Sequence, residues 1–398
     1  MQGKVGITVD DSKRGAKTVE RGSKTQRIVH IIGQLIPGGV EMRTLELIQA
    51  SDHTEFQHYI FVTSGLRGTL DEDFRQAGAV VVYCDIKTVK FTVVFFNFLR
   101  RWSIDVVHSY LMHSSGYILL IAKMAKVSKR IAHFRSDGLP TNKLSALQRT
   151  KRRGLTRLID NAASDIVGLT PANLDTAWNT SWREDSRCRV ITNGIVVADF
   201  SRTEKPEVLK ADEDSIVIVH VGRGDLVTKN REKAITIIAA LKKKCKSRIQ
   251  LIFVGRDGRD ATSAEENRVR WRELAAKYSV AENIKYMGER NDVAAFLQFS
   301  DLFLFTSTLE GLPGVVLEAR ASGIPIVTSD LPGVKFVAQT FSDLRMLSPQ
   351  APDEDWADAM VSALRVAPSA RYEKQQEFLG SRYNFETAFE EFKILWSK

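Results

Sequence analysis

Two glutamates flank a glycine- and proline-rich turn in the second half of the chain. Glu310 directly precedes Gly311-Leu312-Pro313-Gly314, and Glu318 lies eight positions after Glu310. The turn predicts free backbone N–H groups at the start of a helix, where hydroxyl or phosphate oxygens can bind. Glu318 would lie about one turn inside that helix, from which a carboxylate can bind two neighbouring hydroxyls, as on a ribose. Acids also cap helix starts, but two acids at this spacing around the turn favour a binding site.

Two cations follow the apolar run SIVIVHV at residues 215–221. Arg223 comes just after this run, and Lys229 lies six positions later, at the expected start of a helix. Two cations held where a strand ends can bind a diphosphate. Either residue alone would be an ordinary solvated side chain, so the interpretation depends on the acidic motif in the same half of the chain.

A glycine pair occupies the corresponding place in the first half. Gly38 and Gly39 lie in GQLIPGGVEMRTLELI, between an apolar run and an amphipathic segment. Glycines let the backbone approach a ligand, and the helix start that follows can receive an anion; a plain strand-to-helix turn is the alternative. The chain contains neither G-x-G-x-x-G nor G-x-x-x-x-G-K-[ST], which argues against a dehydrogenase and a P-loop kinase.

The elements that position these residues are short apolar, β-branched runs alternating with segments of helical period. This alternation is typical of parallel sheets covered by helices, and 398 residues are enough for two domains. We therefore expect an α/β protein of two Rossmann-like domains, with the chemistry on the loops after the strands. The expected strands are 27–32, 59–63, 79–83, 104–109, 130–134, 165–169 and 189–192 in the first domain, and 215–221, 249–254, 283–287, 301–305 and 324–328 in the second.

The domain boundaries follow from composition. We expect a flexible tail at 1–24, a first domain at 25–200, a charged linker at 201–214 and a second domain at 215–380. The last segment, 382–398, has aromatic and aliphatic residues at helical spacing, which predicts a core-facing helix.

The location expected from the sequence is cytoplasmic. The polar tail lacks the apolar core of a signal peptide, and the run FTVVFFNFL has about half the length that a membrane-spanning helix needs. The three cysteines, Cys84, Cys188 and Cys245, are far apart and in no metal-ligand spacing, as in a reduced cytosolic protein.

The element from Glu310 to Glu318 resembles the E-x7-E motif of the retaining, nucleotide-sugar-dependent glycosyltransferases of family 4. These enzymes have the GT-B fold, in which two Rossmann-like domains face each other across a cleft. In this family the last helix crosses back to the first domain, so the resemblance implies the same for residues 382–398. Further parts of the family pattern occur in the same order: GGVE at 38–41, ITNGIVVADF at 191–200, VGR and KN within 221–230, and ERNDVAAFLQFSDLFLF at 289–305. The pattern is most similar to that of capsule and exopolysaccharide glycosyltransferases, and it covers the chain from residue 27 onward.

The resemblance implies roles for individual residues. Arg223 and Lys229 would stabilise the departing nucleotide diphosphate, Glu318 would bind the ribose, and Glu310 would bind hydroxyls of the donor sugar. The backbone of 311–315 would also contact the sugar, the turn at 254–258 and the loop at 290–293 would frame the base, and the first-domain glycine loop would contact phosphate or sugar. The implied donor-binding residues are Gly38, Gly39, Arg256, Arg290, Val293, Gly311, Leu312, Pro313, Gly314, Val315 and Glu318.

One segment, RIAHFRSDG, departs from the family pattern. The second histidine of the common H-x-H pattern is Arg135 here, whereas His133 is retained and should share a face of its strand with Arg135. His113, in SYLMHSSG, also matches a family histidine. We therefore keep His113, His133, Arg135 and Asp137 as alternatives for the group that approaches the donor, and a satisfied core residue is the alternative for His133.

We expect no metal and no cofactor. A retaining transfer without a metal needs fixed positive charge at the leaving diphosphate, which Arg223 and Lys229 would supply. The three DED segments, at 71–73, 212–214 and 353–355, fall at expected helix starts or in the linker, where capping and solvation explain them. The expected donor is a UDP-linked hexose or N-acetylhexosamine, and the expected acceptor is a sugar or a lipid-linked sugar.

The net charge of +9 is concentrated in one segment: residues 101–160 carry 12 basic and 3 acidic side chains. A basic chain is compatible with nucleic-acid binding, but the segment 142–160 lacks interleaved aromatics. Leucines and an isoleucine between its cations favour an amphipathic helix that, with residues 91–102, docks residues 91–160 on the anionic inner face of the plasma membrane. A solvated helix face is the alternative, and we expect no nucleic-acid partner. The apolar residues in question are Leu144, Leu147, Leu155, Leu158 and Ile159.

A different reaction on the same fold is a further alternative. Nucleotide-sugar epimerases and sugar phosphorylases also use two facing Rossmann-like domains, so the fold alone does not decide the reaction. The complete set of Arg223, Lys229, Glu310 and Glu318 favours transfer from a nucleotide sugar.

Overall fold

The computed structural model describes residues 25–136, 144–197, 204–210, 215–365 and 369–397. The chain forms two compact units: the first comprises Met1–Asn193 and Ala388–Lys398, and the second comprises Gly194–Thr387. The expected tail lies outside the described residues. Of the expected linker, residues 204–210 are described; they include the short helix α7 (Glu207–Lys210), whose Leu209 is buried, so this part packs as structure rather than as an open linker.

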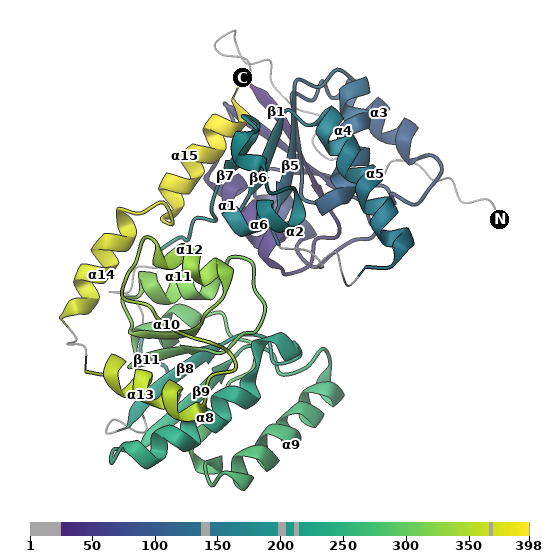
Figure 1. Ribbon diagram of the computed structural model, residues 1–398. Helices are drawn as coiled ribbons and strands as arrows, with labels where there is room; N and C mark the ends of the chain where they lie inside the picture. The colour runs from purple at the N-terminus through teal and green to yellow at the C-terminus, as the bar shows by residue number, and fades with distance from the viewer. Residues whose placement is uncertain (1–24, 137–143, 198–203, 211–214, 366–368, 398) are drawn as a thin grey trace. The chain divides into compact units, whose positions relative to one another are not determined.

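The first unit contains a seven-stranded parallel sheet in the order β3-β2-β1-β4-β5-β6-β7 (Figure 1). All seven strands expected in this half are confirmed, with ends shifted by up to three residues. Apolar, β-branched runs predict such strands well because parallel strands are buried on both faces. The strands are β1 (Gln26–Ile32), β2 (Phe56–Val62), β3 (Val80–Tyr83), β4 (Val106–Ser109), β5 (Lys129–Phe134), β6 (Asp165–Gly168) and β7 (Cys188–Val190).

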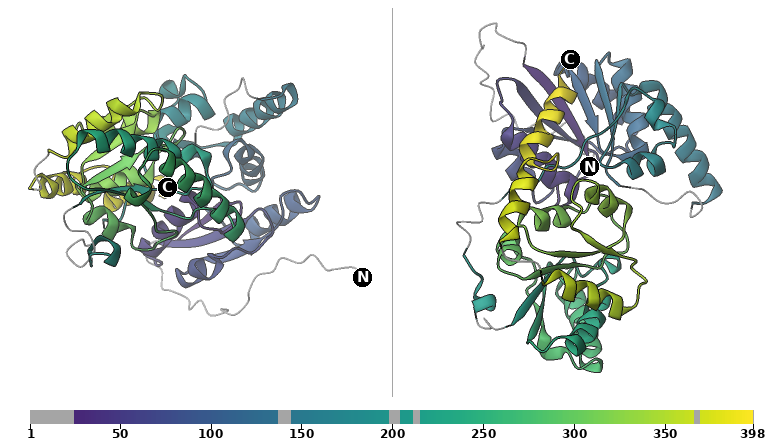
Figure 2. Two further views of the ribbon diagram at one scale, coloured as in Figure 1. Left: turned by 90° about the horizontal axis from the view of Figure 1, so that it is seen from below. Right: turned by 60° about the vertical axis from the view of Figure 1, so that its left-hand side comes forward.

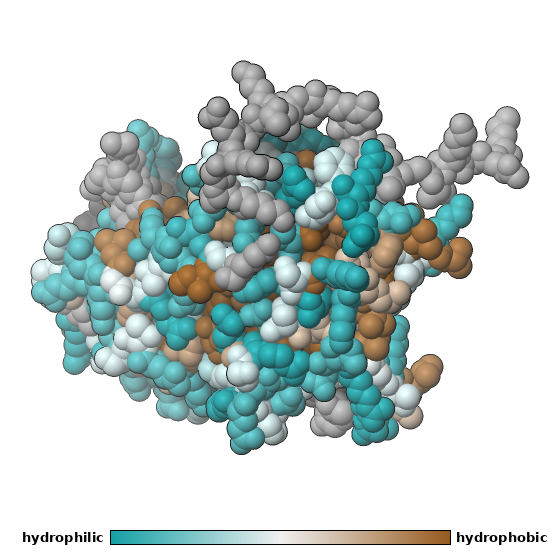
Figure 3. All heavy atoms as spheres, turned by 90° about the horizontal axis from the view of Figure 1, so that it is seen from above, coloured by the Kyte–Doolittle hydropathy of each residue, from teal (hydrophilic) through white to brown (hydrophobic). Residues whose placement is uncertain are grey.

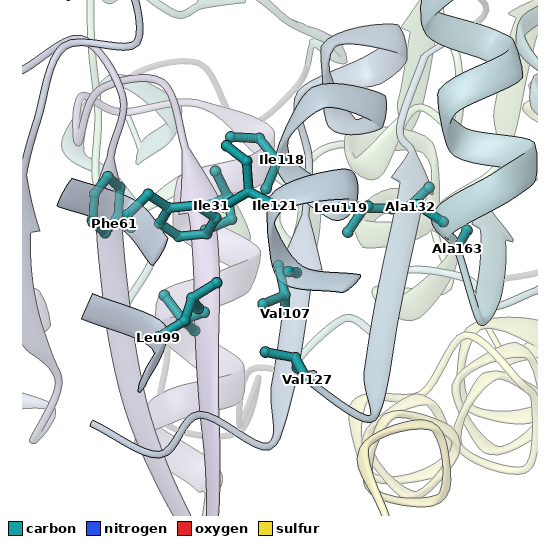
Figure 4. Packing of buried hydrophobic residues seen from close by; sticks show 14 of the residues in the cluster. Ile31, Phe61, Leu99, Val107, Ile118, Leu119, Ile121, Val127, Ala132 and Ala163 are labelled. Carbon is teal, nitrogen blue, oxygen red and sulfur yellow. The ribbon is translucent and has the colours of Figure 1, made fainter. Parts of the chain in front are cut away.

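One face of this sheet packs against α3 (Phe91–Arg101), α4 (Ser115–Met124) and α5 (Ala146–Ala162). Alternate strand residues such as Ile31, Phe61 and Val107 meet the helices in a continuous apolar core (Figure 4). The run FTVVFFNFL is helix α3, and its phenylalanines Phe91, Phe95 and Phe98 point into this core. No helix among the described residues is long and apolar enough to cross a membrane.

The opposite face is covered by α1 (Gly39–Ala50), α2 (Asp71–Gln76) and the end of α15 (Phe385–Trp396). The expected C-terminal helix is confirmed, and Figure 2 shows it in yellow alongside the strands near the N-terminus. Trp396 is fully buried and lies edge-on to Phe56 of β2, with ring centroids 5.7 Å apart. Its indole N–H donates to Nδ1 of His108, 3.1 Å away.

Beneath α15, four buried histidines and one tyrosine form a hydrogen-bonded chain across four strands. Nδ1 of His58 lies 3.1 Å from Nε2 of His30, whose Nδ1 lies 3.1 Å from the Tyr110 hydroxyl. That hydroxyl lies 3.3 Å from Nδ1 of His108, whose Nε2 lies 3.0 Å from Nδ1 of His133. Because His108 accepts from Trp396 at Nδ1, its neutral ring carries the proton on Nε2 and donates to His133.

The second unit contains a six-stranded parallel sheet in the order β10-β9-β8-β11-β12-β13. All five strands expected here are confirmed. The sixth, β13 (Arg345–Leu347), was missed because it is a short, largely exposed edge strand without an apolar run. The others are β8 (Ile216–Val221), β9 (Ile249–Val254), β10 (Ile284–Tyr286), β11 (Leu302–Phe305) and β12 (Ile326–Ser329).

Helices cover both faces of this second sheet (Figure 1). One cluster joins α8 (Arg231–Lys244), α9 (Ala261–Lys277) and α13 (Asp353–Ala363) to the sheet through residues such as Ile238, Trp271 and Trp356. The other helices are α10 (Val293–Gln298), α11 (Gly314–Ala321), α12 (Pro332–Ala338) and α14 (Ala370–Leu379). In each unit the first strand and the fourth are neighbours while the second lies on the other side, which creates a topological switch point at the carboxyl edge of the sheet.

The buried histidines predict that the protein loses stability in mild acid. Burial lowers the pKa of His30, His108 and His133 well below 6.5, and that of His58 to about 3. Below the unfolded value of 6.5 the unfolded chain therefore binds more protons than the folded chain. The free energy of unfolding should fall as the pH drops from 6.5, by about 1.4 kcal/mol per pH unit for each such histidine.

Urea unfolding followed by circular dichroism between pH 7.5 and 5 measures this slope. His58→Phe should reduce the slope by the contribution of one histidine, about 1.4 kcal/mol per pH unit. A stability that does not vary across this pH range would contradict the expectation.

Candidate active site

The predicted residues of the second unit gather on loops at the carboxyl edge of its sheet. Arg223 and Lys229 follow β8, Arg256 follows β9, Arg290 follows β10 and Glu310 follows β11. Strands β8 and β11 are neighbours on either side of the switch point. The strand order reverses at this point, which leaves room for a ligand beyond the carboxyl ends of the strands. The loops predicted from the sequence therefore lie at the edge where α/β proteins bind ligands.

Lys229 and Glu310 form an ion pair at this switch point. Nζ of Lys229 lies 2.5 Å from Oε1 of Glu310, and the two side chains are only 17% and 19% exposed. The backbone N–H of Thr308 donates to the carbonyl of Thr228 at 2.8 Å, which ties the two loops together. The sequence predicted a cation for the diphosphate and an acid for the sugar, and the structure brings the two into direct contact.

A buried polar chain holds the backbone at Lys229. Thr306, just after β11, donates its hydroxyl proton to the carbonyl of Asn230 at 2.9 Å, and its oxygen lies 3.1 Å from Nε2 of His220. Burial lowers the pKa of His220 to about 3, so its ring is neutral and donates to Thr306. Asn230 has φ 52°, a left-handed conformation that asparagine tolerates. Sequence reasoning missed these residues, because nothing in their spacing indicates the contact between β8 and β11.

The next residue, Arg231, is buried and anchors the loops after β8 and β9. Its Nη1 lies 2.5 Å from Oδ1 of Asp257, with side chains 1% and 0% exposed. Its Nη2 donates to the carbonyls of Gly222 and Gly255, at 2.8 and 3.0 Å. The guanidinium carbon lies 4.9 Å from the Phe253 ring centroid and also contacts Trp271. Sequence reasoning missed this pair as well, since an arginine at a helix start is usually solvated.

Arg223 and Arg256 converge on one carboxylate. Nη2 of Arg256 lies 3.1 Å from Asp225 and Nε of Arg223 lies 3.9 Å from it, while both guanidinium groups stay partly exposed. The sequence assigned these arginines to the diphosphate and to the base, respectively. The structure places both arginines beside the buried carboxylate of Asp225, and the exposed part of each guanidinium group can contact an anion.

The loop of 311–314 is pressed against the start of α12. A side-chain carbon at Gly333 would lie 1.6 Å from the carbonyl oxygen of Gly311, so only glycine fits there. Helix α11 begins at Gly314, as expected, with Pro313 as its N-cap, Leu312 buried and Val315 in its first turn. A side-chain carbon at Gly314 would lie 3.9 Å from Oε1 of Glu318, so this carboxylate faces the start of its own helix.

The loop expected to frame the base lies beside the loop after β9. The N–H of Gly255 donates to the carbonyl of Gly288 at 2.7 Å. Arg290 pairs with Asp292 at 2.7 Å and its guanidinium carbon lies 5.7 Å from the Phe296 ring centroid, while Val293 begins α10. The base-binding role of Arg256, Arg290 and Val293 stays a prediction.

In the first unit, the glycine loop meets Arg135. Nη2 of Arg135 donates to the carbonyl of Gly39 at 3.1 Å and to Oδ1 of Asn193 at 2.6 Å. Its guanidinium carbon lies 5.7 Å from the Tyr110 ring centroid, and burial lowers its pKa to about 10. Gly38 is the extended N-cap of α1, and a side-chain carbon there would lie 2.5 Å from the Glu41 carboxylate. The carboxyl edge of the first sheet thus also gathers polar groups.

The two predicted histidines lie in different surroundings. Nε2 of His113, in the 3-10 helix η1 (Met112–Ser114), donates to the carbonyl of Ala177 at 2.8 Å. His133 is 1% exposed and belongs to the buried histidine chain, as the core-residue alternative expected. Asp137 lies outside the described residues. Which of these groups approaches a donor stays a prediction.

The DED segments within the described residues lie at helix starts. Residues 71–73 and 353–355 form the first turns of α2 and α13, and the third segment lies outside the described residues. Within the part of the chain that the structure describes, no group of three or more histidine, cysteine, aspartate or glutamate side chains is arranged to hold a metal ion. The expectation of a metal-free reaction stays a prediction.

Comparison with known proteins assigns the family. Residues 201–377 match the family model described as "Glycosyl transferases group 1". The chain is 30% identical over 318 residues to the capsular polysaccharide biosynthesis glycosyltransferase CapH of Staphylococcus aureus, covering 80% of this chain and 85% of that protein. The chain belongs to the group 1 glycosyltransferases.

Further relatives agree with this assignment. The enzyme is 24% identical over 355 residues to the putative glycosyltransferase EpsF of Bacillus subtilis, covering 86% of this chain and 88% of EpsF. A crystal structure of Anabaena HepE in complex with UDP superimposes with a TM-score of 0.76 at 14% identity, covering 93% of this chain and 99% of that one. A glycosyltransferase from Rickettsia africae gives the same TM-score at 14% identity, covering 94% of this chain and 98% of that one. At this identity the structures show the GT-B fold alone.

The buried arginine of this glycosyltransferase gives a stability prediction. Arg231→Met should lower the free energy of unfolding by about 3–5 kcal/mol, because it leaves Asp257 buried without its main partner. Arg270→Met is the matched control, because Arg270 is 56% exposed and its loss should cost less than about 0.5 kcal/mol. Urea unfolding followed by circular dichroism would contradict the expectation if both variants behaved alike.

Proposed function

We propose that this glycosyltransferase moves a hexosyl or N-acetylhexosaminyl group from a UDP-linked sugar to a sugar or lipid-linked sugar, with retention of the anomeric configuration. The observation that carries the proposal is the Lys229–Glu310 pair at the switch point, with Arg223 on the loop before Lys229 and Glu318 on the helix after Glu310. Lys229, which can bind the diphosphate, and Glu310, which can bind hydroxyls, therefore lie on adjoining loops. Polysaccharide and glycoconjugate biosynthesis is the setting of the named relatives.

Names and titles of relatives support the proposed substrates. One Escherichia coli relative, 24% identical over 335 residues, is named a UDP-Gal:alpha-D-GlcNAc-diphosphoundecaprenol alpha-1,3-galactosyltransferase. A Campylobacter jejuni relative, 26% identical over 271 residues, is named for transfer of N-acetylgalactosamine to a diphospho-undecaprenol-linked sugar. HepE was crystallised with UDP-glucose as well as with UDP. We extend these substrate classes to the present chain as part of the proposal.

In the proposed reaction, the bond between the anomeric carbon and the diphosphate oxygen breaks while a bond to the acceptor oxygen forms on the same face. The acceptor hydroxyl gives its proton to the departing diphosphate. Lys229 and Arg223 stabilise the charge that develops on the diphosphate. Glu310 and the backbone of 311–315 bind sugar hydroxyls, Glu318 binds the ribose, and the loops with Arg256 and Arg290 enclose the base. Gly38, Gly39, His113, His133 and Arg135 stay candidates for contacts from the first unit.

Nucleotide release from a panel of nucleotide sugars, with products identified by mass spectrometry, tests the function. Lys229→Ala should lower kcat/KM about 100-fold or more, because removing one preorganised charge at the leaving group costs that much, and Glu310→Ala should lower it as well. Lys246→Ala is the control, since Lys246 is exposed just before β9, at the opposite edge of the sheet. Unchanged turnover in both site variants would show that the site is assigned wrongly.

We also propose that α3, α4 and α5 contact an anionic membrane. Lys151, Arg153 and Arg157 of α5 are exposed, and Leu147, one turn before Lys151, is 80% exposed. On α3, Val93 is 61% exposed. Figure 3 shows one face of the molecule, on which apolar groups lie among predominantly hydrophilic side chains. Cations beside exposed apolar side chains are the groups that bind anionic lipid.

The apolar face expected on α5 differs from the one observed. Ile159 is fully buried, and α5 approaches α4 closely, since a side-chain carbon at Gly116 would lie 2.3 Å from the Leu155 carbonyl and 3.0 Å from Cβ of Leu158. This part of α5 therefore faces a neighbouring helix. A lipid contact would depend on the cations and on Leu147.

Flotation with liposomes tests the membrane contact. Vesicles rich in phosphatidylserine should bind the enzyme, and the double variant Lys151→Glu/Arg157→Glu should bind at least about tenfold less, at about 1 kcal/mol for each cation removed from the surface. Lys243→Glu/Lys246→Glu reverses two exposed lysines of the second unit and should bind like the unmodified enzyme. Binding that is indifferent to anionic lipid and to salt would contradict the proposal.

A further inference from the structure

Glu310 neutralises the cation that the diphosphate needs. Its carboxylate lies 2.5 Å from Nζ of Lys229, and both side chains are largely removed from water. The hydrogen bond between Thr308 and Thr228 keeps the two loops at this distance. Glu310 also reduces the attraction that Lys229 exerts on any anion bound beside it, because opposite charges so close together largely cancel at a distance.

The donor and the product differ in charge and in what they offer to Glu310. A nucleotide sugar carries one charge on each phosphate, whereas the free terminal phosphate of a nucleoside diphosphate gains most of a second charge above its pKa of about 6. The donor brings sugar hydroxyls, which can donate to the Glu310 carboxylate. The product has lost these hydroxyls and places additional negative charge near the same carboxylate, which is unfavourable in a partly buried site.

We propose that Glu310 is a specificity-determining residue that lowers the affinity of the enzyme for its nucleoside diphosphate product relative to its nucleotide-sugar donor. The carboxylate forms hydrogen bonds to the sugar while the sugar is present and repels the diphosphate once the sugar has left. Lys229 then returns to Glu310, and the pair observed here is the state of the site between turnovers. This inference rests on the proposed function, since it takes a nucleotide sugar as the donor.

Glu310→Gln separates the charge of the side chain from its size. Glutamine can still form hydrogen bonds with a sugar, but it does not neutralise Lys229 and does not repel a diphosphate. UDP and inorganic pyrophosphate should bind to this variant about tenfold more tightly, the effect of removing one nearby, partly screened charge. The affinity for UDP-glucose should rise less or fall, because the variant also loses charge-assisted hydrogen bonds to the sugar.

Isothermal titration calorimetry with UDP, UDP-glucose and pyrophosphate measures these affinities. The Kd of UDP divided by that of UDP-glucose should fall in Glu310→Gln, by about tenfold if the affinity for UDP-glucose is unchanged, and this fall should shrink at high salt. Glu310→Asp keeps the charge and should not bind UDP more tightly. Glu282→Gln removes an equal charge at an exposed position just before β10, at the opposite edge of the sheet, and should change none of the three affinities.

The measured affinities distinguish an error in the role of Glu310 from an error in the proposed function. If Glu310→Gln leaves UDP affinity unchanged, or shifts UDP and UDP-glucose equally, the role of Glu310 in product discrimination is wrong, while the proposed function stands. If the unmodified enzyme binds neither UDP nor UDP-glucose and releases no nucleotide from any donor in the panel, the proposed function itself is wrong. Selective tightening of UDP and pyrophosphate supports the inference.

Discussion

The loops of the candidate site depend on the buried ion pair between Arg231 and Asp257. Both charges are removed from water, and their mutual attraction together with further hydrogen bonds offsets this cost. The guanidinium bonds to Asp257 and to the carbonyls that end β8 and β9, while the second carboxylate oxygen binds Arg268 at 2.6 Å. These bonds join the ends of β8 and β9 to one buried ion pair, so moving either loop away would leave a buried charge with fewer partners.

Glycine makes this arrangement possible. Gly255 has φ 124°, and a side-chain carbon there would lie 2.5 Å from the Gly222 carbonyl oxygen. The strand ends approach because glycine has no side chain, and they remain close because one guanidinium binds both carbonyls. Asn230 has a left-handed conformation and lies between Lys229 and Arg231, whose side chains have different roles. Arg231 points into the protein and holds the loops, whereas Lys229 points to Glu310 and carries the proposed chemistry.

Buried polar groups also join the strands of the first unit, but these groups are neutral. Burial keeps the rings of His30, His108 and His133 uncharged, so each can both donate and accept. Trp396 donates into this chain from the last helix, which explains why residues 388–398 belong to the first unit although the preceding residues belong to the second. Both units thus place hydrogen-bonded, buried polar groups below the edge at which ligands of α/β sheets bind.

The sequence by itself determined the architecture and placed the candidate site residues on loops. Strands buried on both faces are mainly apolar and β-branched, so twelve of the thirteen strands in the described part of the chain could be predicted from apolar runs, and the glutamates and cations could be assigned to loops after strands. Only the tertiary structure decided which groups meet: Lys229 with Glu310, Arg231 with Asp257, His133 with His108, and the turn of α5 at Leu155 with Gly116 of α4. These contacts join residues far apart in the chain, and periodicity and spacing describe only neighbours within one element. The pairing of charges and the choice between core and surface depend on which elements pack together.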